Sequence, residues 1–458
     1  MRRDALRRRG ILSIGAAWMV LVHALFSPSA AQETDLPPYP WDLETCLVVA
    51  RSGNLDLAQV AASAEAQEGR HSQSLGAYLP SMNTSVSFSR NETAEGTIFV
   101  DETGRLINQK VSERYQVSSS VRQSLIDLGA IYTIRGSAQR LQEARQRVES
   151  AKEQLELDVT QNFYALLKAA KQARVALEAV DLGKEQLRRT ESLQELGSVP
   201  RADVLQSRVA LARNELDLIS ARHTVRQGQS NLALVLGLSD DREIAIDTTV
   251  VLPPLDIPWG EEQLWEWASR DRADLQEVRL AHRASRTSAQ AARLDRYPTL
   301  GLNAFYSKTA DRSGDAFELK SGDARWGMTV ALSMNLNPID QLLIGSTKGG
   351  VEAAEWTARQ ERRRLQKKEL EVRLDIRNAI NAWEEARERH SMSQENLRYA
   401  EENLRLQKAL YEGGGGTILE WNNAQVELTR ARSDLLAAQV DLLSAEASLA
   451  RSVGRELR

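Results

Sequence analysis

The sequence predicts a mainly α-helical protomer that also carries four β-strands, and three observations support this fold class. The chain is a tandem duplication, each half contains two segments in which apolar and polar residues alternate, and each half ends in long helical segments that lack proline. Strands with this alternation are typical of bilayer-crossing sheets, so we expect a transmembrane β-barrel attached to long coiled-coil helices.

The duplication is visible when the chain is laid on itself. Pro40-Trp41 recurs as Pro258-Trp259, Pro80 recurs as Pro298 at the same offset, and leucines near the ends of the halves match at almost the same offset. We expect a first repeat over 32–238, an inter-repeat segment over 239–257 and a second repeat over 258–458. Each repeat reads as helix, strand, loop, strand, very long helix, turn and long helix.

The segment 1–31 has the composition of an export signal peptide. Five arginines precede the apolar run 11–26, and the small residues 29–31 suit signal peptidase. Arg8-Arg9 also fits a twin-arginine signal, but we favour ordinary Sec export because basic signal regions often contain an arginine pair. Beyond the signal there is no run of about 18 apolar residues, so any membrane contact must be made by strands.

Charge argues against nucleic acid as a partner. The whole chain has a net charge of −4. The signal holds five positive charges and one negative charge, so its removal leaves the mature chain near −8. An acidic chain of this kind binds nucleic acid poorly, and we expect no such partner.

The four alternating segments form two predicted hairpins, 80–127 and 298–337, with exposed loops at 90–114 and 308–325 and strands of about 9 to 11 residues. A half-buried hairpin in a soluble domain is the alternative. Four strands cannot close a barrel, for which about eight is the minimum, so closure requires several copies. Three copies give twelve strands, and two would also reach the minimum. The side chains predicted to face lipid are Met82, Val86, Phe88, Val117, Val121, Leu300, Leu302, Tyr306, Trp326, Met328, Val330 and Leu332.

The helical segments 136–196 and 343–411 contain no proline, and the last helix has leucines at a heptad spacing from Leu428 to Leu449. This spacing predicts a coiled-coil seam, with alanines three positions after the leucines. Each long helix stops at a turn that starts a helical hairpin. The residues of the two turns are Gly197, Ser198, Val199 and Pro200, and then Gly413, Gly414, Gly415, Gly416 and Thr417.

Residue patterns for catalysis are missing. The five histidines are scattered, the single cysteine, Cys46, reads as a small buried helix residue, and the glycine run 413–416 lacks the ending of a phosphate-binding loop. We therefore predict that the protein is not an enzyme and uses no metal or cofactor. An exported enzyme would show a cluster of polar catalytic residues, and none is found.

Four short motifs, in their order along the duplicated chain, resemble the TolC family of outer-membrane efflux proteins. They are Tyr78-Leu79-Pro80 and Arg296-Tyr297-Pro298 before the strands, and Asp203-Val204-Leu205 and Ile418-Leu419-Glu420 after the turns. The resemblance covers essentially the whole mature chain. It implies a homotrimer with a twelve-stranded barrel in the outer membrane, a twelve-helix tunnel through the periplasm, and an equatorial belt.

The same resemblance implies a passive exit duct of a tripartite efflux or type I secretion system. The turns would meet a periplasmic adaptor (membrane fusion) protein, which joins the duct to an inner-membrane pump. Acidic side chains just after the second turn narrow the periplasmic entrance in the family, and the matching position is Glu420. A plain helix N-terminal acid is the alternative role for Glu420.

Asp203 matches an acidic position of the first turn and is expected to cap its helix or to take part in closure. Asn423 stands where some members of the family have a second acidic residue. This departure argues against the salt bridge that locks the tips in those members. The alternative function is a soluble periplasmic coiled-coil scaffold or pump adaptor.

Overall fold

The computed structural model describes residues 40–100, 106–239, 244–248, 258–310, 324–334 and 345–457, all within the unit Pro40–Arg458. The predicted signal 1–31 and most of the inter-repeat segment lie outside the described residues. The first half contains α2 (Leu43–Gly53), α3 (Leu55–Gly76), β1 (Ser81–Val100), β2 (Leu106–Ile126), α4 (Leu128–Glu195) and α5 (Arg201–Leu236). The second half contains α6 (Glu261–Asp271), α7 (Ala273–Leu294), β3 (Thr299–Ala310), β4 (Ala324–Ser333), α9 (Ser346–Glu412) and α10 (Ile418–Val453).

The two halves repeat the same elements in the same order. β1 and β3 begin at Ser81 and Thr299, each directly after one of the duplicated prolines, and α5 and α10 each begin just after a tip turn. The single helix predicted before each hairpin is in fact two helices. Each pair is interrupted at an equivalent residue, Asn54 or Arg272, whose backbone is extended at φ −70° or −68°.

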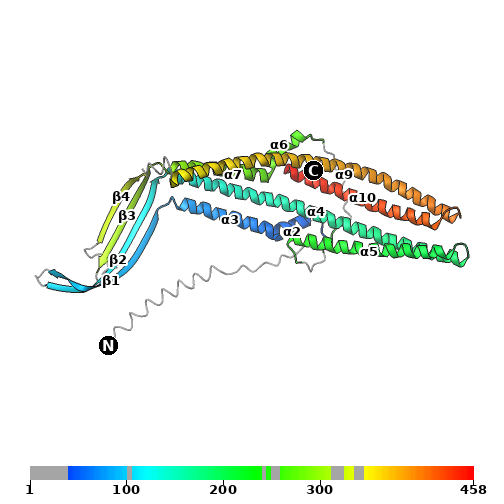
Figure 1. The fold of residues 1–458 in the computed structure, drawn as a ribbon, viewed down its shortest axis with the longest axis horizontal. Coiled ribbons are helices and arrows are strands. Elements are labelled where there is room, and N and C mark those ends of the chain that lie inside the picture. The colour runs from blue at the N-terminus through cyan, green and yellow to red at the C-terminus, as the bar shows by residue number, and fades with distance from the viewer. Residues whose placement is uncertain are drawn as a thin grey trace, which may run out of the picture. The chain divides into compact units, whose positions relative to one another are not determined.

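The four strands form one antiparallel sheet in the order β1-β2-β3-β4 (Figure 1). β1 and β2 have 20 and 21 residues, about twice the predicted length, because most of the predicted loop 90–114 is paired strand. Arg90 pairs with Glu113, and pairing resumes at Thr97 and Gln109 after a register shift. Backbone pairing sustains this extension, in which apolar and polar residues do not alternate regularly, so the sequence does not reveal it.

The second hairpin differs less from the prediction. Lys308 belongs to β3 and Arg325 to β4, although both were assigned to the loop, and 311–323 lies outside the described residues. β4 ends at Ser333, whereas the predicted hairpin continues to 337. Met334 is not in a strand, and 335–337 is outside the described part of the chain.

The helices pack lengthwise, with the sheet at one end of the unit and the α4–α5 and α9–α10 turns at the other (Figure 1). α4 packs against α3, α5, α7 and α10, and α9 packs against α7 and α10. The predicted Leu/Ala seam of α10 is core: Leu428, Leu442 and Leu449 are buried, as are Ala431, Ala438 and Ala445. The 68 residues of α4 span about 100 Å at about 1.5 Å per residue.

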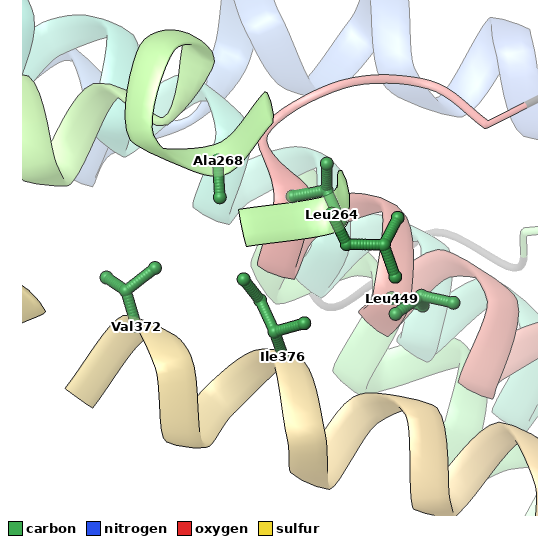
Figure 2. Packing of buried hydrophobic residues seen from close by; sticks show 6 residues of the cluster. Leu264, Ala268, Val372, Ile376 and Leu449 are labelled. Carbon is green, nitrogen blue, oxygen red and sulfur yellow. The ribbon is translucent and has the colours of Figure 1, made fainter. Parts of the chain in front are cut away.

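A compact apolar cluster joins α6 to the long helices (Figure 2). Leu264 and Ala268 of α6 contact Val372 and Ile376 of α9 and Leu449 of α10, and all five are fully buried. Burial of such side chains stabilises the fold by about 1.5 to 3 kcal/mol for each large one. The cluster fixes α6 against the middle of α9 and the C-terminal end of α10.

Helix ends are set by specific residues. Asp42, Asn54, Asp127 and Thr417 accept N-terminal backbone hydrogen bonds of α2, α3, α4 and α10. No helix in the described ranges is long and apolar enough to cross a membrane.

Candidate functional site

One face of the sheet is mostly apolar and partly exposed. Strand register places Met82 opposite Val121, Val121 opposite Ala304 and Ala304 opposite Met328, so one row crosses all four strands. The exposed fraction is 81% for Trp326 and 71% for Leu332. All the side chains predicted to face lipid lie on this face by register, and the remainder are Val86, Phe88, Val117, Leu300, Leu302, Tyr306 and Val330.

The opposite face is rich in hydroxyl and amide groups. The Ser85 and Ser118 hydroxyls lie 2.7 Å apart, and Gln116 donates from Nε2 to the Ser307 hydroxyl at 3.3 Å. Phe305 is an aromatic exception on this face, where it lies opposite Ser120. A sheet with one apolar and one hydrogen-bonding face suits a boundary between hydrocarbon and water.

The sheet has two outer strands. β1 pairs only with β2 and β4 only with β3 among the described residues, which leaves one backbone edge of each without a partner. Unpaired backbone groups cost several kcal/mol each in hydrocarbon. A single copy therefore cannot place this sheet in a bilayer.

The two helical hairpins turn at the far end of the unit. Each turn contains one glycine with a positive φ, Gly197 at 71° and Gly414 at 79°, a conformation that other residues rarely adopt. The residues predicted for adaptor contact, 197–200 and 413–417, form these turns, and most of them are exposed.

Glu420 lies in the first turn of α10 and forms a capping box with Thr417. Its backbone N–H donates to Thr417 Oγ1 at 3.3 Å, and its Oε2 accepts from the Thr417 backbone N–H at 2.9 Å. These backbone and side-chain hydrogen bonds lower the pKa of Glu420 below its usual value. The carboxylate is fully exposed, so within one protomer Glu420 is a charged helix cap at the tip.

Asp203 connects the two hairpins. Tyr411 of α9 donates from its hydroxyl to Asp203 Oδ2 of α5 at 3.3 Å. Burial, together with the Asp203 charge and the hydrogen bond, raises the pKa of Tyr411 to about 12, so the phenol keeps the proton that it donates. Asp203 therefore accepts a hydrogen bond from the other hairpin of the same chain. It does not occupy the N-cap position of α5, which is taken by Pro200.

Two further polar contacts join the hairpins near the tips. Arg189 of α4 forms an ion pair with Glu412 of α9 at 2.9 Å. Gln186 of α4 donates to Asn422 of α10 at 2.5 Å. Sequence reasoning missed these residues and Tyr411, because no local pattern marks a contact between helices that belong to different halves of the chain.

A buried charged group lies at the break between α6 and α7. Arg272 pairs with Asp274 and Asp375, each at 2.8 Å, and Lys368 pairs with Asp274 at 2.9 Å. The exposed side-chain fraction is 7% for Arg272 and 14% for Asp274. Burial raises the pKa of Asp274, but the Arg272 charge and the hydrogen bonds from Arg272 and Lys368 outweigh it, so the net pKa is lowered.

Within the described residues, no group of three or more His, Cys, Asp or Glu side chains is placed to hold a metal ion. Cys46 is buried on α2, and burial, with a smaller effect from Asp42, raises the pKa of its thiol to about 12.

The family model described as outer membrane efflux protein matches residues 47–238 and 266–455, once in each half. The chain belongs to this outer membrane efflux protein family. It is a TolC-like outer-membrane efflux channel with a periplasmic helical extension, and its family consists of non-enzymatic transport proteins. This membership replaces the alternative of a soluble periplasmic scaffold or pump adaptor.

Solved channel structures share the fold. CusC superposes with a TM-score of 0.78 at 17% identity over 94% of this chain and 99% of that chain. CmeC of Campylobacter jejuni gives 0.78 at 16% identity over 93% of both chains. The open state of Neisseria gonorrhoeae MtrE gives 0.74 at 18% identity over 91% of this chain and 89% of that chain. A comparison with curated proteins finds no match.

Proposed function

We propose that three copies of this efflux channel protomer form a continuous exit duct, with a twelve-stranded barrel in the outer membrane and a twelve-helix tunnel in the periplasm. The observation that carries this proposal is the sheet with one mostly apolar face, whose outer strands β1 and β4 each have one edge without a partner among the described residues. Closing the ring through copies of the chain removes every edge from lipid. Two copies would give eight strands, and the family resemblance favours three.

The order of neighbouring helices across the protomer follows the order of the strands, so the helical wall and the sheet can both be continued by the same neighbouring copy. Near the sheet the neighbours run α3, α4, α7 and α9, and near the tips they run α5, α4, α10 and α9. The protomer therefore has one side formed by β1, α3 and α5 and another formed by β4 and α9. Joining the second side of one copy to the first side of the next extends the sheet and the helical wall together.

The duct is proposed to serve a tripartite efflux or type I secretion system as a passive conduit. The exposed turns 197–200 and 413–417 would receive a periplasmic adaptor protein, which connects the duct to an inner-membrane pump. The hydroxyl-rich face of the sheet would line the lumen. Energy would enter at the pump, so the duct itself needs no hydrolysis.

Closure at the periplasmic end is proposed to rest on the polar contacts between the hairpins. The Tyr411–Asp203 hydrogen bond and the Arg189–Glu412 ion pair are both at the tips, where an adaptor would act. Separation of these contacts would let the coiled coils untwist and widen the entrance. Three Glu420 carboxylates at that entrance would attract cations and repel anions.

Native mass of the mature protein, extracted from outer membranes in detergent, tests this assembly. We expect a trimer that requires detergent to stay soluble. A monomer or dimer that stays soluble without detergent would contradict the duct.

A further inference from the structure

The polar face of the sheet carries charge of one sign. Strand register fixes the face of each side chain over 81–91, 114–124, 299–309 and 325–333. The charged residues that these segments place on the polar face are Arg114, Arg122 and Arg325, and no Asp or Glu is among them. All three arginines are exposed, and none takes part in an ion pair with another residue that the structure describes. The chain as a whole has 63 acidic and 59 basic residues, so this face departs from its overall composition.

Two of these arginines flank an aromatic ring. Phe305 of β3 lies opposite Ser120 of β2 and opposite Gly327 of β4. Arg122 is two residues from Ser120, and Arg325 is two residues from Gly327 in the opposite direction along the sheet. Diagonal neighbours in a sheet lie about 7 to 8 Å apart, which is within reach of long side chains. Arg122, Phe305 and Arg325 therefore form a diagonal line across three strands of the polar face.

Gly327 makes room for the aromatic ring. A Cβ atom at Gly327 would lie 2.8 Å from Cε1 and 2.9 Å from Cζ of Phe305, so a larger residue does not fit beneath the ring without a shift. The ring therefore lies against the backbone of β4, and the exposed fraction of Phe305 is 43%. An exposed ring on a hydroxyl-rich face offers an apolar surface to a ligand, and Arg122 and Arg325 add positive charge on both sides of it.

We propose that Arg122, Phe305 and Arg325 form a binding site for small aromatic anions that pass through the barrel. The site rests on the proposed trimeric duct and names a class of cargo that the duct favours. The aromatic part of such a molecule stacks on the Phe305 ring, with ring centroids about 4.5 to 7 Å apart. Its carboxylate or sulfonate pairs with a guanidinium group, whose planar fork matches the oxygen atoms of these anions.

The width of the proposed barrel lets the arginines act on its whole lumen. Twelve strands about 4.8 Å apart and tilted by about 40° enclose a backbone radius of about 12 Å. The side chains narrow this space further, and the Debye length at physiological salt is about 8 Å. Three arginines from each of three copies would therefore raise the local concentration of anions across the barrel.

The two ends of the proposed duct would then carry opposite charge. Glu420 places carboxylates at the periplasmic entrance, whereas arginines line the barrel. Arg122 lies opposite Ser81, the first residue of β1, and Arg114 lies opposite Ser89, about 26 Å further along the strands. Because the arginines are exposed, each ion pair with cargo is weak, and an anion can move from one to the next and leave.

Equilibrium binding of a fluorescent aromatic anion tests the site. Methoxypyrene trisulfonate, titrated with detergent-purified trimers of the native chain, should bind and show a rise in fluorescence anisotropy. The double variant Arg122→Gln/Arg325→Gln should weaken binding by about 3- to 10-fold, because two exposed ion pairs are lost. Phe305→Ser should weaken binding by a similar factor through the loss of stacking. The matched control is Arg90→Gln, which removes an arginine from the apolar face of the same sheet and should leave binding unchanged.

Competition separates aromatic recognition from attraction by charge alone. Benzenetricarboxylate and citrate each carry three carboxylates, and the aromatic competitor should displace the probe at the lower concentration. Equal displacement by the two would overturn the site. Unchanged affinity in Arg122→Gln/Arg325→Gln, or an equal loss in Arg90→Gln, would also overturn it, and a native mass of a trimer would leave the duct standing. A monomeric native mass would instead contradict the duct itself.

Ion selectivity gives a second readout that needs no organic probe. In planar bilayers, Arg122→Gln/Arg325→Gln should shift the reversal potential in a salt gradient toward cations, which is opposite to the shift expected for Glu420→Gln. Arg90→Gln should not shift it. Conducting trimers of the double variant with the reversal potential of the native chain would show that these arginines do not act on the lumen and would overturn the proposal.

Discussion

Arg272 donates from Nη1 to the backbone carbonyl of Ser452 at 3.2 Å, and so ties the break between α6 and α7 to the end of α10. Asn54 makes the equivalent tie in the first half, donating from Nδ2 to the Val235 carbonyl at 2.8 Å. Both halves thus have a hydrogen bond from the helix break to a carbonyl near the end of the last helix, but the donor is an amide in the first half and a guanidinium in the second. The neutral amide needs no counter-charge, whereas the buried guanidinium is balanced by Asp274 and Asp375.

Substitution of Arg272 tests this difference. Arg272→Ala should lower the free energy of unfolding by about 3 to 5 kcal/mol, because it leaves the buried Asp274 carboxylate without its main partner. Arg270→Ala is the control, since Arg270 pairs with Glu266 on the surface at 70% and 60% exposure, and it should cost under about 1 kcal/mol. Denaturant unfolding in detergent gives both values, and equal losses would contradict a special role for the buried group.

Acidification should weaken the same group. The folded pKa of Asp274 lies below its ordinary value of 3.8, so the stability it contributes is present above that value and is lost as the pH falls through the lowered pKa. The melting temperature of the native chain should exceed that of Asp274→Asn at pH 7, and the difference should shrink below about pH 4. Burial raises the pKa of Glu153 and the Asp274 charge adds a smaller increase, so Glu153 contributes in the opposite direction, and this contribution is smaller in Asp274→Asn than in the native chain. A difference that stays constant with pH would refute this account.

The sequence predicted the repeated fold well and the tip contacts poorly. Alternation in 82–88 and 326–332 identified the lipid-suited face because every second residue of a strand shares a face. Local spacing says nothing about which helices meet, so the Tyr411–Asp203 contact required the structure. The β1–β2 hairpin was predicted, but its strands were predicted too short, because residues 90–114 lack the regular alternation of a half-buried strand.

Glu420 should influence ion selectivity without being needed for the fold. Glu420→Gln removes three charges from the proposed trimeric entrance and should lower the cation preference measured as a reversal potential in a salt gradient. The lowered pKa of Glu420 predicts that the native preference persists from neutral pH down to about its ordinary value of 4.5. Glu427→Gln, an exposed change two turns along α10, should leave selectivity unchanged. An equal effect of both substitutions would show that Glu420 does not line the entrance.

A charged side chain should reduce the amount of assembled protein when it is placed on the apolar face of β4, but not when it is placed on the polar face. Val330→Arg places a guanidinium on the apolar face, where a bilayer-midplane arginine costs about 2 to 4 kcal/mol, and should reduce the amount of assembled protein in outer membranes. Thr329→Arg, one residue away on the polar face, should be tolerated. Comparable yields of both variants in the outer-membrane fraction would contradict the assignment of faces.

Single-channel recording in planar bilayers tests the central claim most directly. Purified trimers of the native chain should produce stepwise currents of low conductance, and Tyr411→Phe should raise that conductance, because it removes the hydroxyl that donates to Asp203 and loosens the closed entrance. Tyr399→Phe, which removes the hydroxyl of an exposed tyrosine elsewhere on α9, should not raise the conductance. Correctly folded trimers that insert but carry no current, with or without the Tyr411 hydroxyl, would contradict a continuous duct closed at its tips.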